Sequence, residues 1–234
     1  MNAPVALDSI DHHDLRVAWR HGPEFGDAVN QMLALPGEFE GLAREFPILF
    51  RRDDAGAWHA VVLLGLERGE NLFLDGTRWT SRIVPAVQAR GPFSVALRPQ
   101  TGEATLHVDL ADPRIGREVG EPLFLPHGGN APALQQATRH LRVIGEGLPA
   151  AQAMFAALEE AGLIEPVAIT VTLGSGREVV LNQYHTVGAD RLAALDGATL
   201  ERLNRTGVLR LAFLQQASLG NMARLIELKQ ARGD

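Results

Sequence analysis

The segment FPILFRRDDAGAWHAVVLLGL, residues 46–66, says most about the architecture of this chain. Two runs of apolar and β-branched residues, Phe46–Phe50 and Trp58–Leu66, are separated by a short polar stretch that contains Ala55-Gly56. Short apolar runs on either side of turn residues are typical of two antiparallel strands joined by a tight connection. Residues 46–66 therefore predict a β-hairpin.

Similar patterns occur before and after this hairpin. The predicted strands are Leu15–Trp19, Asn71–Leu74 (ending at the turn Asp75-Gly76), Phe93–Leu97, Ala104–Leu110, Val167–Leu173 and Glu178–Tyr184. The last two strands are joined by GSGR and form the clearest hairpin of the sequence. Residues 15–125 are thus rich in strands.

Residues 131–231 are mostly helical in pattern, apart from the hairpin at 167–184. The predicted helices are Pro132–Gly145, Pro149–Gly162, Arg191–Leu195, Thr199–Arg205 and Leu209 to about Ala231. Pro149 marks either the start of a new helix or a kink. Strands joined by hairpins and followed by helices favour an α+β fold with an antiparallel sheet. We expect one domain over residues 1–234, with the late hairpin returning to the early sheet.

Composition and charge argue against nucleic acid as a partner. The chain has 234 residues, a net charge of −6 and no cysteine, and Lys229 is its single lysine. Nucleic-acid grooves need clustered cationic side chains, whereas the arginine pairs Arg51-Arg52 and Arg78/Arg82 lie among acids. Without cysteine, neither a disulfide framework nor a thiolate nucleophile can form.

We expect no membrane span and a cytoplasmic location. The longest apolar stretch, Ala60–Leu66, is far shorter than the roughly 20 residues that a spanning helix needs. The first residues show no basic start followed by an apolar run, so no secretory signal is predicted. Export by a route without an N-terminal signal stays open.

Several segments, in the same order along nearly the whole chain, resemble the SapC family of bacterial proteins. They are HDLRV (13–17), EFPILF (45–50), LGLERGENLFLDGTRW (64–79), IVPAVQARGPF (83–93), GEPLF (120–124), FAALEEAGLIEP (155–166), VGADRLAALDGATLERLNRTGVL (187–209) and ASLGNMARLIELK (217–229). The family is distinct from a transporter permease of the same name, which would need spanning segments.

The resemblance implies a cellular context but no reaction. The family name refers to surface-layer genes, and members often lie beside genes for TonB-dependent receptors, halogenase-like proteins and cupin-like oxygenases. This implies a role in surface remodelling or uptake, with a halogenase-like or cupin-like protein as a partner.

The segment from residue 69 to residue 99 is the first candidate for a binding surface. Pro85 and Pro92 keep it from being a central strand, so it predicts an irregular connection that displays polar groups. The candidate ligand- or partner-binding residues are Asp75, Arg78, Trp79, Arg82 and Arg90. The structural interpretation is that Trp79 packs on the core and that Arg82 or Arg90 pairs with an acid.

A second candidate is a metal site. His107 and Asp109 would project to one side of a strand, as two ligands of a facial Fe(II) triad require, with His185, His127 or His140 as a third ligand. An Fe(II)-dependent oxygenase is therefore the alternative function. A solvated polar face of a hairpin gives the same pattern.

We favour a non-catalytic accessory or binding protein of unknown ligand, without a cofactor. No complete set of catalytic residues and no phosphate-binding loop is visible in the sequence. The apolar residues of the last helix nearly encircle it, which indicates either a core helix or a shared surface in a homodimer.

Overall fold

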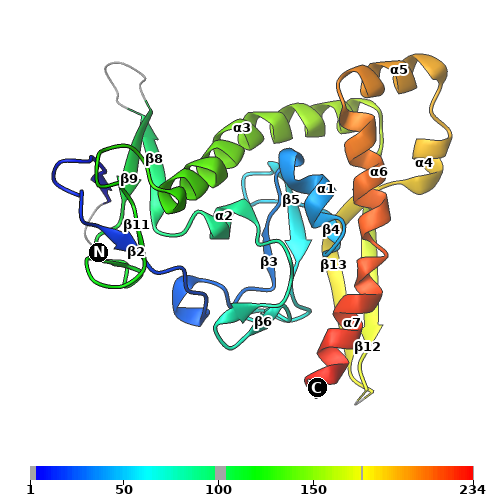
Figure 1. The fold of residues 1–234 in the computed structure, drawn as a ribbon. Helices are drawn as coiled ribbons and strands as arrows, with labels where there is room; N and C mark the ends of the chain where they lie inside the picture. The colour runs from blue at the N-terminus through cyan, green and yellow to red at the C-terminus, as the bar shows by residue number, and fades with distance from the viewer. Residues whose placement is uncertain (1–3, 98–103, 175, 234) are drawn as a thin grey trace. The chain divides into compact units, whose positions relative to one another are not determined.

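A computed structural model of the chain describes residues 4–97, 104–174 and 176–233, and it contains both helices and antiparallel sheets (Figure 1). This confirms the predicted α+β fold. By contacts the chain divides into two compact units, and each unit combines two segments of sequence. Unit 1 contains residues 1–21 and 86–145, and unit 2 contains residues 22–85 and 146–234. The division does not follow the strand-rich and helix-rich parts of the sequence, and the single domain over 1–234 stays a prediction.

Unit 1 is built from two small antiparallel sheets and the first half of the long helix α3 (Pro132–Glu160). One sheet has the order β1-β9-β8 and the other the order β10-β2-β11. The strands are β1 (Val5–Ala6), β2 (Arg16–Val17), β8 (Phe93–Leu97), β9 (Ala104–Val108), β10 (Ile115–Gly116) and β11 (Glu121–Pro122), and a short helix α2 (Ala86–Ala89) precedes β8. The predicted hairpin of β8 and β9 is confirmed, while its turn lies outside the described residues.

The core of unit 1 lies where α3 meets both sheets. Its buried side chains are Leu15, Val17, Phe93, Val108, Leu123, Phe124, Ala133, Leu134, Ala137 and Leu141. The small residues Ala133 and Ala137 on the first turns of α3 allow a close approach, and larger side chains from α3, the strands and the flanking loops fill the rest of the core.

Unit 2 contains a five-stranded antiparallel sheet with the order β12-β13-β4-β5-β3. The strands are β3 (Gln31–Leu33), β4 (Ile48–Arg52), β5 (Trp58–Leu63), β12 (Ile164–Thr172) and β13 (Glu178–Val187), and β6 (Leu74–Asp75) and β7 (Arg78–Trp79) form a separate hairpin around Asp75-Gly76. The hairpin predicted from residues 46–66 is confirmed, with Ile48 opposite Val62 and Arg52 opposite Trp58.

The late hairpin returns to the early sheet, as predicted, because β13 pairs with β4 at His185 and Phe50. The two strands then part, and a side chain of the helix α6 (Val208–Ser218) fills the gap. Gln215 is fully buried; its Oε1 accepts from the Val187 amide at 3.0 Å and its Nε2 donates to the Ile48 carbonyl at 2.8 Å. A glutamine therefore satisfies backbone groups that would otherwise be buried without a partner.

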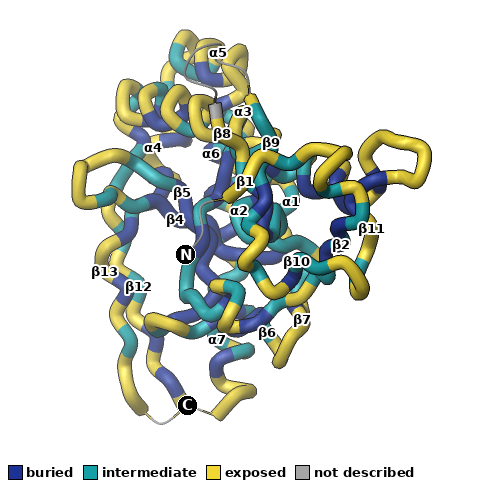
Figure 2. Tube along the Cα trace, turned by 90° about the vertical axis from the view of Figure 1, so that its left-hand side faces the viewer, coloured by how far each residue is buried: buried dark blue, intermediate teal, exposed yellow. Residues whose placement is uncertain are grey.

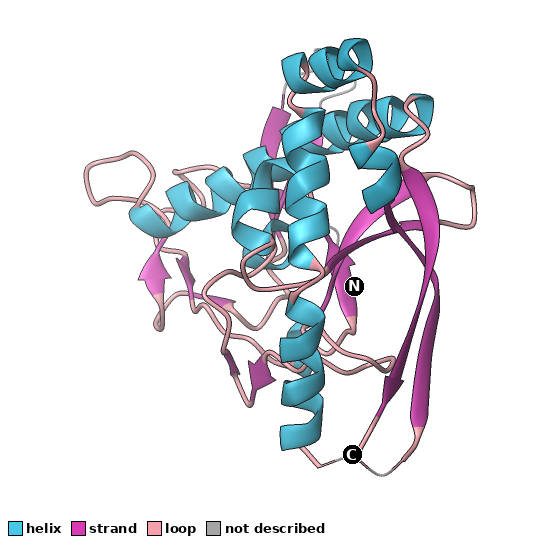
Figure 3. Cartoon of the chain, turned by 90° about the vertical axis from the view of Figure 1, so that its right-hand side faces the viewer, coloured by secondary structure: helices cyan, strands magenta, loops and turns pink. Residues whose placement is uncertain are grey.

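Helices complete unit 2. They are η1 (Pro23–Phe25), η2 (Pro36–Glu38), α1 (Phe39–Leu42), the second half of α3, α4 (Ala189–Ala193), α5 (Gly197–Arg205), α6 and α7 (Asn221–Ala231). Within unit 2, Figure 3 shows α6 and α7 following one another, with the long β12–β13 hairpin running alongside them. In Figure 2, β4 and β5 are largely buried, whereas the far end of that hairpin is exposed.

Three of the predicted helices have the wrong boundaries. The segments 132–145 and 149–162 form the single helix α3, with Pro149 inside it. The carbonyl that would face the proline ring belongs to Gly145, whose backbone adjusts more easily than that of other residues. The helix predicted from Leu209 to Ala231 is divided at Leu219-Gly220, where the amides bond to carbonyls three residues earlier and tighten the turn.

Among the residues that the structure describes, no helix combines the length and the apolar composition that a membrane span requires.

Candidate functional site

The strongest candidate site is a cavity of about 600 Å³ in unit 2, which we call the polar pocket. Its lining residues are Asn30, Gln31, Arg51, Asp54, Arg68, Gln183 and Tyr184. They come from the start of β3, the end of β4 and the turn after it, the loop after β5, and β13. Every one of these side chains carries a polar group, which is unusual because small-molecule sites are mostly apolar.

The β-strand alternation directs Arg51 and its neighbour Arg52 to opposite faces of the sheet. Arg51 lines the polar pocket, whereas Arg52 lines a different cavity of about 440 Å³ beside α3. We call this second cavity the Trp58 pocket. The two arginines can therefore be compared directly, because they share one strand and differ in their surroundings.

The guanidinium of Arg52 has an acidic and an aromatic partner. It donates to Glu159 Oε1 at 3.1 Å and lies 4.3 Å from the centroid of the Trp58 ring, and Trp58 Nε1 donates to the same Glu159 oxygen at 2.7 Å. The Trp58 ring stacks on Phe155, with 5.9 Å between the ring centroids. A salt bridge, a cation–π contact and an aromatic stack thus join α3 to this face of the sheet.

Arg51 has no such partner. Across residues 4–97, 104–174 and 176–233, neither Arg51 nor Arg68 makes an ion pair or a hydrogen bond. The acid closest in sequence, Asp53, is committed elsewhere: it binds His59 Nε2 at 2.8 Å and accepts from the amides of Ala55 and Ala57. The polar pocket therefore holds two guanidinium charges and one carboxylate, that of Asp54.

Tyr184 closes one side of the polar pocket. Its hydroxyl, on β13, donates at 2.9 Å to Gln31 Oε1 on β3, so the two side chains together reach over the intervening strands β4 and β5. Burial raises the pKa of the Tyr184 hydroxyl, and the charge of Arg51 opposes that shift. The hydroxyl stays protonated at neutral pH and acts as a fixed donor to Gln31.

The loop that carries Arg68 is held by the chain's single lysine. Lys229 on α7 donates to Glu67 Oε2 at 2.6 Å and to Glu70 Oε1 at 2.7 Å, and only 10% of its side chain is exposed. Glu70 also accepts from the amide of Leu66 at 2.9 Å. These bonds fix the backbone on both sides of Arg68, so its guanidinium is presented from an ordered loop.

The pKa shifts of Glu67 and Lys229 agree with these contacts. Hydrogen bonds from Arg177 and Lys229 lower the pKa of Glu67 to about 2, and the two carboxylates raise the pKa of Lys229. The turn is also tight: a Cβ on Gly65 would lie 2.5 Å from the carbonyl oxygen of Glu70. Glu67 and Glu70 are therefore structural partners of Lys229 and leave Arg68 without a counter-charge.

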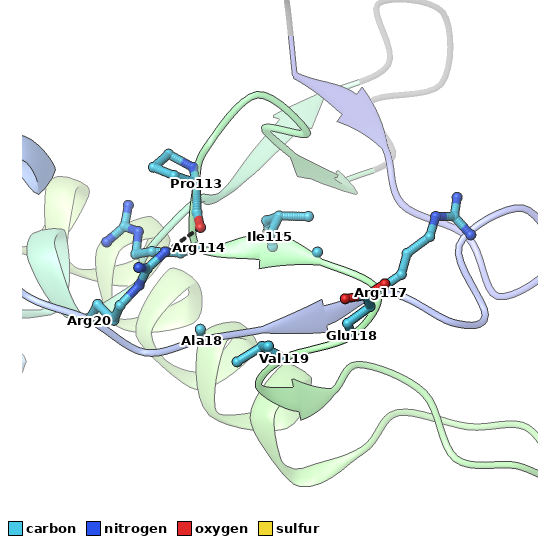
Figure 4. Close-up of a pocket in the computed structure, with 9 residues that line it drawn as sticks. Ala18, Arg20, Pro113, Arg114, Ile115, Arg117, Glu118 and Val119 are labelled. Carbon is cyan, nitrogen blue, oxygen red and sulfur yellow. Dashed lines mark hydrogen bonds between the residues drawn. The ribbon is translucent and has the colours of Figure 1, made fainter.

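Unit 1 has a cavity of similar size, about 560 Å³, that three arginines line (Figure 4). Arg114 makes a two-pronged contact with Asp112 (2.9 and 2.6 Å), Arg117 pairs with Asp14, and Arg20 donates to the Pro113 carbonyl. Figure 4 shows Arg117 directed away from Arg20 and Arg114. Burial alone would raise the pKa of Asp112, but the Arg114 bonds outweigh it and lower the pKa. Arg114 and Arg117 are therefore paired with carboxylates, and Arg20 is held by a backbone carbonyl.

The structure separates the five residues of the first sequence-based candidate. Arg90 belongs to unit 1 and the other four residues belong to unit 2. Asp75, Arg78 and Arg82 are exposed, but Trp79 is buried, with 7% of its surface exposed, and its Nε1 donates to Asp27 Oδ1 at 2.7 Å. Trp79 therefore packs in the core, as the structural interpretation of this segment expects.

Two of the three arginines of that candidate also have partners. Arg82 lies 3.8 Å from Glu45, and Arg90 donates to the carbonyl of Phe93. Burial lowers the pKa of Arg90, and the charge of Arg114 adds to the shift. The structural interpretation of this segment thus fits Trp79 and Arg82, and a ligand- or partner-binding role of the five residues stays a prediction.

The candidate metal ligands form no assembled group among the residues that the structure describes. His107 and Asp109 lie on and just after β9 in unit 1, whereas His185 lies on β13 in unit 2. His107 Nδ1 donates to the Pro4 carbonyl at 3.2 Å, and Asp109 accepts from the amide of Ala111 at 2.9 Å. Within the described ranges, no three histidine or carboxylate side chains gather in a group that could hold a metal ion.

Sequence reasoning missed the polar pocket because its residues come from four separate segments. One signal was present: in a strand, neighbouring arginines must point to opposite faces, so Arg51 and Arg52 could not share the same acids. Nothing in the sequence shows that the partner of Arg52 is Glu159, more than 100 residues later.

The fold and the pocket define an α+β protein with a polar, cationic cavity on its main sheet. Residues 7–225 match the SapC family, and the chain belongs to that family. No curated protein and no solved structure gives a significant match to the chain.

Proposed function

We propose that this chain is a non-catalytic binding protein whose polar pocket holds a small anionic molecule. The observation that supports it is the pair Arg51 and Arg68, two guanidiniums in a cavity of about 600 Å³ that make no ion pair with any described residue. Guanidinium is the side-chain group that best matches carboxylate and phosphate oxygens, through two parallel hydrogen bonds.

The charge balance of the chain favours this proposal. The chain as a whole carries a net charge of −6, so the two guanidiniums of the polar pocket stand out against an acidic protein. Arg51 is half-buried, and burying part of a charge costs free energy unless it is paired. A bound anion would pair with Arg51, and the removal of that cost would favour binding.

Calorimetric titration of the full chain with small carboxylates and inorganic phosphate tests the proposal. We expect Arg51→Gln to weaken binding by about 10- to 100-fold, because hydrogen bonds to charged groups contribute about 1.5–3 kcal/mol. Binding should also weaken as NaCl is raised. Arg52→Gln is the matched control, since it changes the next residue of the same strand on the opposite face. Absence of binding by every anion would reject the proposal.

An accessory role with a protein partner is a separate part of the proposal, and it rests on the family resemblance alone. We propose a cytoplasmic protein, linked to surface-layer or TonB-dependent uptake systems, that binds a halogenase-like or cupin-like neighbour. The exposed residues Arg78 and Arg82 are the positions to test. The test is co-purification of the complex. Loss of the complex in the double variant Arg78→Glu/Arg82→Glu, with the complex preserved in Arg205→Glu, would support the accessory role. A complex that both sets of variants preserve would contradict the assignment.

The remaining predictions have no observation that favours them further. Phe213 on α6 is 56% exposed, and a homodimer through the C-terminal helices stays a prediction. The Fe(II)-dependent oxygenase with His107 and Asp109 stays a prediction as well.

A further inference from the structure

We infer that the anion is polyhydroxylated: a sugar acid or a sugar phosphate. This inference rests on the proposed function, because it names the class of molecule that the polar pocket takes. It follows from the side chains that share the pocket with Arg51 and Arg68.

The hydrogen-bonding capacity of the pocket is largely unused. The side-chain amides of Asn30 and Gln183 and the carboxylate of Asp54 make no hydrogen bond to any residue in the described ranges. Gln31 uses only its oxygen, which accepts from Tyr184, and its NH₂ group remains available. The lining therefore offers both donors and acceptors around the two cations.

Hydroxyl groups are the ligand chemistry that this mixture suits. A hydroxyl donates one hydrogen bond and accepts others, and a side-chain amide offers the complementary NH₂ and carbonyl groups side by side. A carboxylate only accepts, so Asp54 calls for a donor on the ligand. An array of hydroxyls on one ring meets all of these groups, while a carboxylate or phosphate on the same ring meets the guanidiniums.

Other anions fit the lining less well. A dicarboxylate would place a second carboxylate, apart from the one that the guanidiniums bind, in a pocket that contains Asp54, where like charges repel. A nucleotide base or a fatty acid needs an apolar wall, which most small-molecule sites provide. Here the one large ring, that of Tyr184, comes with a hydroxyl already bound to Gln31. The cavity of about 600 Å³ leaves room for a hexose-sized ligand and bridging water.

The experiment compares ligands that differ in one chemical feature. The full chain is titrated with glucuronate, galacturonate, glucose 6-phosphate, glucose, acetate and inorganic phosphate. We expect at least one of the three charged sugars to bind about 10-fold or more tightly than acetate, phosphate and glucose, because a single good polar contact changes affinity by about that factor. A uronate or a phosphorylated sugar as the tightest ligand identifies the source of the charge.

The variant Asp54→Ala separates the sugar contacts from the charge contacts. It should reduce the affinity for the charged sugar toward that of acetate and leave acetate binding unchanged or slightly tighter. If acetate or phosphate binds as tightly as all three charged sugars, this inference is wrong and the proposed function stands. If no anion binds, or glucose binds as tightly as the charged sugars, both are wrong.

Discussion

Two consecutive arginines of β4 lie on opposite faces of one sheet, and their environments differ. One arginine is paired within the fold, and the other faces a candidate binding pocket. Arg52 is paired with Glu159 and stacked on Trp58, in a cluster that joins α3 to the sheet. Arg51 faces a cavity with Arg68 and has no partner among the described residues. The two arginines have the same chemistry and the same strand, so the difference comes from what the rest of the fold places opposite them.

The arginines of unit 1 extend the comparison. Arg114 and Arg117 line a cavity of similar size to the polar pocket, yet each is bound to an aspartate. A cavity lined by cations is therefore not in itself a binding site. The polar pocket differs because its two arginines, Arg51 and Arg68, make no ion pair with any described residue.

The largest effect is expected at Phe155, the ring that anchors the Trp58 pocket. Phe155 is buried and touches both Phe50 and Trp58, so Phe155→Ala should lower the free energy of unfolding by about 3–5 kcal/mol. Urea unfolding followed by circular dichroism measures it. Anion affinity of the folded fraction should hardly change. A variant of native stability would show that this face is not structural.

The next effect concerns Gln215, the α6 side chain that bonds to backbone groups of β4 and β13. Gln215→Ala leaves the Val187 amide and the Ile48 carbonyl buried without a partner, which costs about 1–3 kcal/mol. Thermal unfolding should show this loss, whereas Gln152→Ala, an exposed glutamine on α3, should change the free energy of unfolding by less than about 0.5 kcal/mol. Equal stability of the two variants would contradict the role of Gln215.

A smaller effect is expected from the lysine that holds the Arg68 loop. Lys229→Met should lower the free energy of unfolding by about 1–2 kcal/mol, because the ion pairs are partly exposed and weaker than fully buried ones. It should also weaken anion binding several-fold, since Arg68 loses its fixed position. The control, Arg205→Gln, breaks an exposed pair with Glu201 and should change neither quantity. Unchanged anion binding in Lys229→Met would show that the contacts of Lys229 do not position Arg68.

How much of this could be predicted from the sequence depends on the range of the interactions. The hairpins at 46–66 and 167–184 follow from local alternation and turn residues, and so does the α+β class. The single helix α3 was missed because Pro149 is a strong local signal that the surrounding contacts override. The polar pocket was missed because Arg51 and Arg52 look the same in the local sequence. Only contacts across the fold distinguish them: Arg52 pairs with Glu159, whereas Arg51 pairs with no residue that the structure describes.

The smallest effect is a pH dependence of the same loop. The pKa of Glu67 is lowered to about 2 from an ordinary value of 4.5, so its contribution to stability is complete above pH 4.5 and is lost as the pH falls toward 2. Urea unfolding at pH 6 and pH 3 should show a smaller loss in Glu67→Gln than in the native chain. Equal acid sensitivity of the two proteins would show that Glu67 is not bound to Arg177 and Lys229 in solution.

The most direct measurement is the affinity for glucuronate of three proteins: the native chain, Arg51→Gln and Arg52→Gln. If the Arg51 guanidinium binds the ligand, Arg51→Gln binds glucuronate about 10-fold or more weakly than the native chain, because a charge-assisted contact is lost. Arg52→Gln then stays within about twofold of the native affinity, since its guanidinium is already committed to Glu159. Equal losses in both variants, or a larger loss in Arg52→Gln, would contradict the account.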